Sequence, residues 1–217
     1  MEELQQLAKK CTHRGDMPSQ ILPRLYLSGH PGRYNAGAAR ACAANPTDYM
    51  REKHAVKLMV NCAAGKSLSL GIIETSSGEK HTISDLTEFM HLIQSPPGDP
   101  KAEDDGAMFH LNLPLDDIPE FDLMPFLDSA VQCIEACLLL GSDDATSEFR
   151  TVRSGVLVFC QMGVSRSASI VCAYLMKRSK ASAAHVIDFL QSRRQQVDPN
   201  EGFRSTLKRY EAIISAL

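Results

Sequence analysis

The sequence lacks several features that would point to particular classes of protein. Its 217 residues contain no tryptophan, no C-x-x-C pair and no run of 18 consecutive apolar residues. Without such a run, no segment is long and apolar enough to cross a membrane as a helix. Positive charge is also not in excess, because 23 basic residues face 26 acidic ones and the net charge is −3. General binders of nucleic acid or of anionic membranes are normally more basic, so we expect neither as a partner.

The N-terminus carries no targeting pattern. Met1-Glu2-Glu3-Leu4 lacks the basic and apolar stretches of a signal peptide, and Glu2 stands where myristoylation requires glycine. The seven cysteines are an odd number and are expected to be free thiols in a reducing compartment. We therefore predict a cytoplasmic protein, with the nucleus as the alternative.

Two cysteines, Cys133 and Cys137, are four positions apart on a helical pattern. Such spacing places both on one face of a helix, where a buried thiol behaves as a small apolar side chain. A metal-binding pair is the alternative, but no second Cys or His pair completes a set of ligands. We expect no metal site and no other cofactor.

Hydrophobic periodicity predicts an α/β fold with a central mixed, mostly parallel sheet flanked by helices on both faces. Residues 1–217 are interpreted as a single domain with inserts at about 66–107 and 141–153. Strand patterns occupy 21–29, 56–62, 108–113 and 155–160, and a hairpin pattern joins 71–75 to 80–83. Helical patterns occupy 1–12, 84–94, 121–140, 167–178, 182–194 and 202–216.

Some positions refine this interpretation. The run 155–160 is apolar on both faces, which is typical of a central parallel strand. Pro23 restricts its own strand to a sheet edge, and Ser84 is the expected N-cap of its helix. The stretches 31–48 and 95–106 are rich in Gly, Ala, Asn, Pro or acidic residues and predict loops, the first mixed with weak helix.

The segment after that central strand carries the clearest chemical signal. It reads Cys160-Gln161-Met162-Gly163-Val164-Ser165-Arg166-Ser167-Ala168-Ser169. A cysteine at the carboxyl end of a strand, followed by a loop and a helix N-terminus, faces backbone amides that can bind an anion. Gly163 permits a positive φ, and Arg166 offers a planar fork to two oxygens of a tetrahedral anion. Amide dipoles and Arg166 are expected to ionise the Cys160 thiol.

A less specific interpretation is a buried cysteine followed by a surface arginine, which is what most matches to C-x5-R represent. Here the strand, the glycine, the two serines that flank Arg166 and the apolar helix occur in the order that an anion site requires. This order favours a nucleophilic thiolate beneath a bound phosphate dianion.

At these residues the sequence resembles the dual-specificity protein phosphatases, within the cysteine-dependent phosphatases that share C-x5-R. The resemblance extends to the ranges 21–29, 56–61, 113–123, 173–176 and 199–211. It implies a cysteine-dependent phosphatase-like fold and a reaction through a cysteinyl-phosphate. It also implies a phosphorylated protein as substrate, and we expect a monomer.

The resemblance assigns roles residue by residue. Cys160 is the nucleophile, Arg166 holds the phosphoryl oxygens, and Ser167 hydrogen-bonds the sulfur. The phosphate-binding residues are Gln161, Met162, Gly163, Val164, Ser165 and Arg166. Asn200 either ties this loop from behind or is simply the N-cap of the last helix. The general acid is Asp117, with its neighbour Asp116 as the alternative.

One residue departs from the family pattern. Phe159 stands where these enzymes usually have a histidine before the cysteine, and phenylalanine cannot make the hydrogen bonds of that side chain. Because Cys160 and Arg166 are both present, a working enzyme is nevertheless expected. The alternative is a catalytically weak or inactive phosphate-binding pseudophosphatase that acts as a scaffold.

Two absences limit the substrates. Without tryptophan, the chain cannot carry the Trp-Pro-Asp acid loop of larger tyrosine-specific phosphatases. The loop also has no lysine, which disfavours phosphoinositides. Elsewhere, Arg193 and Arg194 are interpreted as a solvated helix face, with the docking of an acidic partner as the alternative.

Overall fold

The computed structural model describes residues 2–9, 18–30, 50, 54–65, 69–74, 80–83, 85–94, 108–139 and 154–216. The predicted loops 31–48 and 95–106 and the predicted insert 141–153 lie outside these residues, whereas the predicted insert 66–107 lies partly within them. No helix in these ranges is both long enough and apolar enough to cross a membrane. The same ranges contain no group of three or more His, Cys, Asp or Glu side chains that could hold a metal ion.

A seven-stranded mixed sheet forms the centre of this structure, in the order β1-β2-β7-β3-β6-β4-β5. Its strands are β1 (Ser19–Leu22), β2 (Leu25–Ser28), β3 (Val56–Asn61), β4 (Ser69–Glu74), β5 (Lys80–Thr82), β6 (Met108–Asn112) and β7 (Gly155–Phe159). The four central strands β2, β7, β3 and β6 run parallel. The outer strands β1, β4 and β5 pair antiparallel. The predicted α/β class with a mixed sheet flanked by helices is confirmed.

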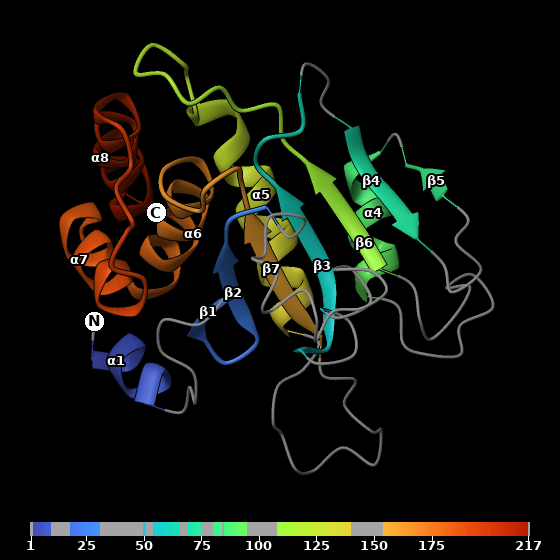
Figure 1. Ribbon diagram of the computed structural model, residues 1–217, viewed down its shortest axis with the longest axis horizontal. Helices are drawn as coiled ribbons and strands as arrows, with labels where there is room; N and C mark the ends of the chain where they lie inside the picture. The colour runs from blue at the N-terminus through green and yellow to red at the C-terminus, as the bar shows by residue number, and fades with distance from the viewer. Residues whose placement is uncertain are drawn as a thin grey trace.

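The helices follow the predicted pattern closely. They are α1 (Glu2–Lys9), α4 (Leu86–Gln94), α5 (Met124–Leu139), α6 (Arg166–Ser179), α7 (Ala183–Arg193) and α8 (Glu201–Ser215). Figure 1 shows α6, α7 and α8 gathered on one side of the sheet, with α8 beyond α6. Ser182 caps α7, because its side chain accepts a hydrogen bond from the backbone N–H of His185.

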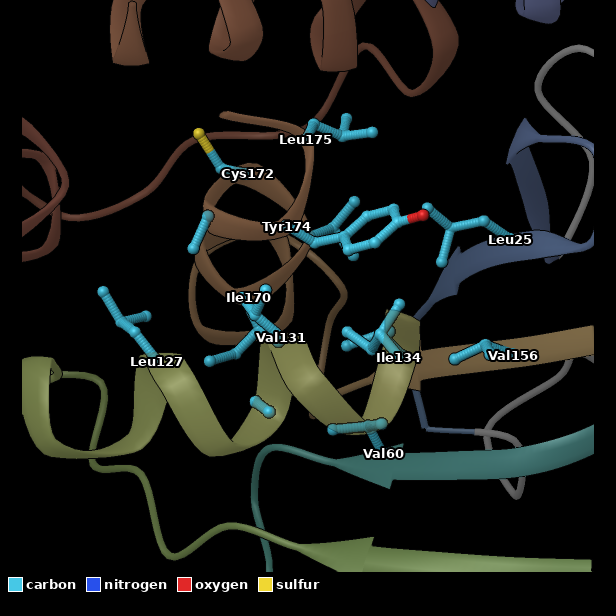
Figure 2. Packing of buried hydrophobic residues seen from close by; sticks show 14 of the residues in the cluster. Leu25, Val60, Leu127, Val131, Ile134, Val156, Ile170, Cys172, Tyr174 and Leu175 are labelled. Atoms are coloured by element: carbon cyan, nitrogen blue, oxygen red, sulfur yellow. The ribbon is translucent and has the colours of Figure 1, made fainter. Parts of the chain in front are cut away.

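The main core lies between one face of the sheet and the helices α5 and α6. All five residues of β7 are buried, as predicted for a central parallel strand. In Figure 2, Val60 and Val156 of the sheet face the helix α5, and Ile170 and Tyr174 of α6 pack above it. Cys133 and Cys137 are both fully buried in this core, which confirms the predicted apolar role.

A smaller cluster covers the other face. It contains Tyr26, Met50, Val56, Met59, Met108, Leu157 and Phe159, of which Met50 is helical. The ring of Tyr26 also lies 4.9 Å from that of His54, another helical residue. Phe159 is thus a packing residue on the face opposite α5 and α6.

Two local predictions need correction. Pro23 lies in the tight turn between β1 and β2, not within an edge strand, and β1 itself was not predicted. The helix α4 begins at Leu86, and the side chain of Asp85 accepts a hydrogen bond from the Glu88 N–H at 2.9 Å. Asp85 therefore caps α4 in the role expected for Ser84, which lies outside the described residues.

The parallel strands bring their carboxyl ends to one edge of the sheet, as the arrowheads of β2, β7, β3 and β6 show in Figure 1. Asn61 pairs in register with both Phe159 and Asn112, so the segments that follow these strands start side by side. Ligands of open α/β sheets bind at this edge. Both Cys160 and the segment that contains Asp117 leave the sheet here.

Candidate active site

Cys160 directly follows β7, and the loop after it leads into α6 at Arg166. The sulfur accepts two hydrogen bonds of 3.2 Å, one from the backbone N–H of Gly163 and one from the hydroxyl of Ser167. Both donors come from the loop or from the first turn of α6, where backbone N–H groups lack partners within the helix. The structure thus surrounds the sulfur with donors, which is the arrangement expected for a thiolate.

The pKa of Cys160 is lowered from its ordinary value. Burial by itself raises this pKa, and the residue is only 1% exposed. Hydrogen bonds from the Ser167 hydroxyl and from the backbone amides of Ser167, Gly163 and Met162 outweigh burial because they stabilise the thiolate. The hydrogen bonds are thus the main causes that lower this pKa, in agreement with the role that the sequence suggested for the loop amides.

In the other described cysteines, the pKa is shifted in the opposite direction, upward. Burial raises the pKa of Cys133 and of Cys137 to about 12. It also raises the pKa of Cys62 and of Cys172. Cys160 is therefore the one described cysteine with a lowered pKa, which distinguishes a reactive thiol from structural ones.

Gly163 gives the loop its shape. Its φ is +68°, as predicted, and this left-handed conformation is costly for a residue with a side chain. A Cβ atom here would also overlap the backbone of Ser28 and would lie 2.6 Å from the Gly29 nitrogen. The loop therefore lies directly against the end of β2, at a distance that only glycine permits.

Arg166 turns its guanidinium toward the segment that follows β6. Its Nη1 donates to the carbonyl oxygen of Leu115 at 3.4 Å, and its Nε lies 3.5 Å from Oδ2 of Asp117. This Nε is buried and has no hydrogen-bond partner among the described residues. A buried donor without a partner is costly, and an oxyanion would satisfy it.

Asp117 lies against the loop. Its Oδ1 accepts hydrogen bonds from the Ser165 hydroxyl at 2.6 Å and from Asn200 Nδ2 at 3.0 Å. Both carboxylates are exposed, but the contacts with Ser165 and Asn200 are made by Asp117 and not by Asp116. Of the two carboxylates that the sequence offered, the structure brings Asp117 to the site.

Asn200 combines the two roles that the sequence left open. Its side-chain oxygen accepts a hydrogen bond from the Phe203 N–H at 2.9 Å and so caps α8. Its backbone N–H donates to the hydroxyl of Ser165 at 3.2 Å, and its side-chain amide reaches Asp117. The start of α8 thus links the cysteine loop, which runs from Cys160 to Arg166, to the segment that carries Asp117.

A close approach at Gly202 supports this link. A Cβ atom on Gly202 would overlap the carbonyl group of Pro119. The segment after Asp117 therefore rests on the first turn of α8, and glycine is required where the two backbones meet.

The remaining predicted phosphate-binding residues have side chains of differing exposure. Gln161 and Val164 are half-buried and Met162 is exposed. Ser165 is 6% exposed, because its hydroxyl lies between Asp117 and Asn200. The side chains of these residues differ widely in polarity, so their peptide groups are the feature that they share.

Sequence reasoning missed Arg194. Both Arg193 and Arg194 are only 5% exposed, which contradicts the predicted solvated face. The Arg194 Nε donates to the Gly163 carbonyl at 2.9 Å, and its Nη2 donates to the Met162 carbonyl at 3.1 Å. A signal was present, since the two arginines continue the spacing of the buried Val186, Ile187 and Leu190 along α7.

We predict that replacing Ser167 with alanine raises the pKa of Cys160 by about one to two pH units. A hydrogen bond to a charged group contributes about 1.5–3 kcal/mol, and 1.36 kcal/mol corresponds to one unit. The measurement is the pH dependence of Cys160 alkylation by iodoacetamide.

Ser169→Ala is the matched control for this substitution. Ser169 is equally buried on α6, but its hydroxyl donates to the Ser165 carbonyl rather than to the sulfur. The control should leave the midpoint unchanged. Equal midpoints in wild type and Ser167→Ala would contradict the assigned hydrogen bond.

Comparisons with known proteins agree with this geometry. The family model "Dual specificity phosphatase, catalytic domain" matches residues 72–213, a range that includes Asp117, the cysteine loop and Asn200. Human dual specificity phosphatase 28 is 30% identical over 151 residues, which are 69% of this chain and 77% of that protein. A solved structure of human DUSP28 has a TM-score of 0.57 at 22% identity and covers 94% of this chain and 99% of the other.

Other relatives are much longer than the matched region. The "MAP kinase phosphatase with leucine-rich repeats protein 3" of Dictyostelium discoideum is 47% identical over 58 residues, which are 27% of this chain and only 7% of that protein. The chain therefore matches only a small part of that relative's length. Because the family model matches most of the sequence and one relative aligns over more than two thirds of it, the chain belongs to the dual specificity phosphatase family.

Proposed function

We propose that this chain is a protein phosphatase that hydrolyses phosphotyrosine, phosphoserine/threonine or both through a cysteinyl-phosphate intermediate. The observation that carries the proposal is the Cys160 sulfur, whose pKa is lowered by hydrogen bonds at the start of a helix. The Nε of Arg166 supports it, because this nitrogen is buried without a hydrogen-bond partner beyond its 3.5 Å ion pair with Asp117 and is a donor suited to a phosphoryl oxygen.

In the first step, the Cys160 thiolate attacks phosphorus, and a new S–P bond forms as the bond to the leaving oxygen breaks. The loop amides and Arg166 bind the three nonbridging oxygens of the phosphoryl group throughout. Asp117 gives its proton to the leaving phenol or alcohol oxygen. Its position against Ser165 and Asn200 places the carboxyl group beside the phosphate-binding loop.

In the second step, water attacks the phosphorus of the cysteinyl-phosphate, and Asp117, now a carboxylate, accepts the proton of that water. The S–P bond breaks, and the sulfur leaves as a thiolate. The hydroxyl of Ser167 donates to this sulfur and stabilises the negative charge that returns to it. Inorganic phosphate is released, and no metal takes part in either step.

The surface around the loop supports a phosphorylated protein as the substrate. Met162 in the loop is 58% exposed, and Ile118, next to Asp117, is 50% exposed. Apolar side chains at the rim suit a phosphorylated side chain on a polypeptide better than a strongly charged inositol phosphate. The loop also offers no lysine for further phosphate groups.

Phe159 is the reason for a second candidate function, which is a phosphate-binding scaffold without turnover. The Phe159 ring packs in the cluster on the second face of the sheet, so the usual histidine hydrogen bonds are replaced by apolar contacts. The Cys160 pKa is nevertheless lowered, which favours catalysis.

A single-turnover experiment separates the two candidates. Protein in excess is mixed with 4-nitrophenyl phosphate in EDTA, and quenched samples are analysed for nitrophenol and phosphate. The enzyme proposal predicts stoichiometric release of both, with transient phosphate bound to Cys160. Binding of the substrate with no nitrophenol release would support the scaffold.

A further inference from the structure

Four successive carbonyl groups of the cysteine loop accept hydrogen bonds from donors outside the loop. Gln161 O accepts from the His30 N–H at 3.2 Å, and Val164 O accepts from the Asp198 N–H at 2.9 Å. Between them, Met162 O accepts from Arg194 Nη2 and from Gln196 Nε2, both at 3.1 Å. Gly163 O accepts from Arg194 Nε at 2.9 Å. Four successive carbonyls therefore have donors on the outer side of the loop.

This pattern fixes the direction of the amides that face the sulfur. In a trans peptide unit, the C=O and the next N–H are coplanar and point in opposite directions. The Met162 carbonyl shares its unit with the Gly163 N–H, which donates to the Cys160 sulfur at 3.2 Å. The Gly163 carbonyl shares its unit with the N–H of Val164. Holding these carbonyls outward turns their partner N–H groups inward.

Arg194 is suited to this task because one planar guanidinium reaches two successive carbonyls. Its third nitrogen, Nη1, donates to the Ser19 hydroxyl at 3.2 Å, which anchors the group to β1. A lysine ammonium is a single point of charge on a flexible stem and cannot reproduce this fork. The side chain is 5% exposed, so its place is set by packing as well as by hydrogen bonds.

We propose that Arg194 is a positioning residue that orients the Gly163 and Val164 amides toward the bound phosphoryl group. It does so from behind the loop, without contact with the substrate. The inference rests on the proposed function of this loop, but it concerns the binding of an oxyanion and so does not depend on turnover.

The test compares two substitutions with a matched control. Arg194→Lys keeps the positive charge and removes the fork, and Arg194→Gln removes both. The control is Arg193→Gln, at the last residue of α7, which directly precedes Arg194 and is equally buried at 5% exposure. Arg193 Nε and Nη2 donate to the Gln20 carbonyl of β1.

There are two readouts. One is the dissociation constant of orthovanadate, measured by isothermal titration calorimetry, and the other is the pH dependence of Cys160 alkylation. Both Arg194 variants should bind vanadate about tenfold more weakly or worse, because the loop loses hydrogen bonds that orient its amides. Their alkylation midpoints should also move to higher pH. Arg193→Gln should match wild type in both measurements.

Two results would overturn the inference. One is wild-type vanadate affinity in Arg194→Lys, which would leave the positive charge rather than the fork as the cause. The other is an equal loss of affinity in Arg193→Gln. If circular dichroism shows that Arg194→Gln is unfolded, the vanadate affinity of Arg194→Lys tests the inference by itself. A wild-type protein that binds vanadate but releases no phosphate would contradict the proposed function while leaving this test intact.

Discussion

Replacing Cys160 with serine is expected to reduce kcat/KM for 4-nitrophenyl phosphate by about 10⁴-fold or more. A serine hydroxyl does not ionise near neutral pH, and the hydrogen bonds that stabilise a thiolate cannot make it a comparable nucleophile. The donors around the position remain, since Gly163 and Ser167 contribute their own groups. The variant should therefore still bind vanadate while turnover is lost.

Cys133→Ser is the matched control for this substitution. It makes the same change of sulfur to oxygen in the same apolar core, but in α5. Its kcat/KM should stay within about threefold of wild type, even if the protein is less stable, because a buried hydroxyl affects packing rather than chemistry. A Cys160→Ser variant that turns over at the wild-type rate would refute the cysteinyl-phosphate mechanism.

Asp117→Asn is expected to slow the hydrolysis of phenyl phosphate by about 10²–10⁴-fold, the usual contribution of a general acid. The loss should be smaller for 4-nitrophenyl phosphate, whose leaving group departs readily without a proton. Asparagine keeps an oxygen that can accept the hydrogen bonds from Ser165 and Asn200. The substitution therefore removes the proton with little change in shape.

The neighbouring carboxylate supplies the control. Asp116→Asn alters an exposed side chain that does not accept the hydrogen bonds from Ser165 and Asn200, and both substrates should be hydrolysed within about twofold of the wild-type rate. The decisive quantity is the ratio of the rates for the two substrates. If Asp116→Asn shows the leaving-group dependence and Asp117→Asn does not, the acid has been assigned to the wrong residue.

The sequence was sufficient for features in which several local signals agree. The run of β7 is apolar on both faces, a glycine and two serines follow, and an apolar helix begins at once. The position of Cys160 at the end of a central strand could therefore be predicted. The cap Asn200 was predictable for the same reason, since it precedes a clear helical pattern.

Features that depend on tertiary contacts could not be predicted. β1 has only four residues and ends at Leu22, directly before Pro23, so it is too short to show a periodicity of its own and is defined by its pairing with β2. The choice of Asp117 over Asp116 depends on the approach of Ser165 and Asn200.

The burial of Arg194 could not be predicted from the sequence for a different reason. The pair Arg193-Arg194 was visible, but a charged side chain on a helix is normally solvated, and the carbonyls that bury Arg194 come from a loop about 30 residues earlier. The spacing of buried residues along α7 can be read from the sequence alone. The carbonyl groups that accept hydrogen bonds from Arg194 can be identified only from the fold.

The most direct test of the central claim is the titration of Cys160 in the protein without substrate. Alkylation by iodoacetamide is followed from pH 4 to pH 10 by mass spectrometry of the peptide that contains residue 160, with Cys160→Ser as the blank. The thiolate is the reactive form, so the rate rises with pH through the pKa. We predict a midpoint below the ordinary cysteine value of about 8.5, with Cys133 and Cys137 unreactive throughout because burial raises the pKa of each to about 12. A Cys160 midpoint at or above the ordinary value would contradict the account, because the ring of donors would then not be stabilising a thiolate.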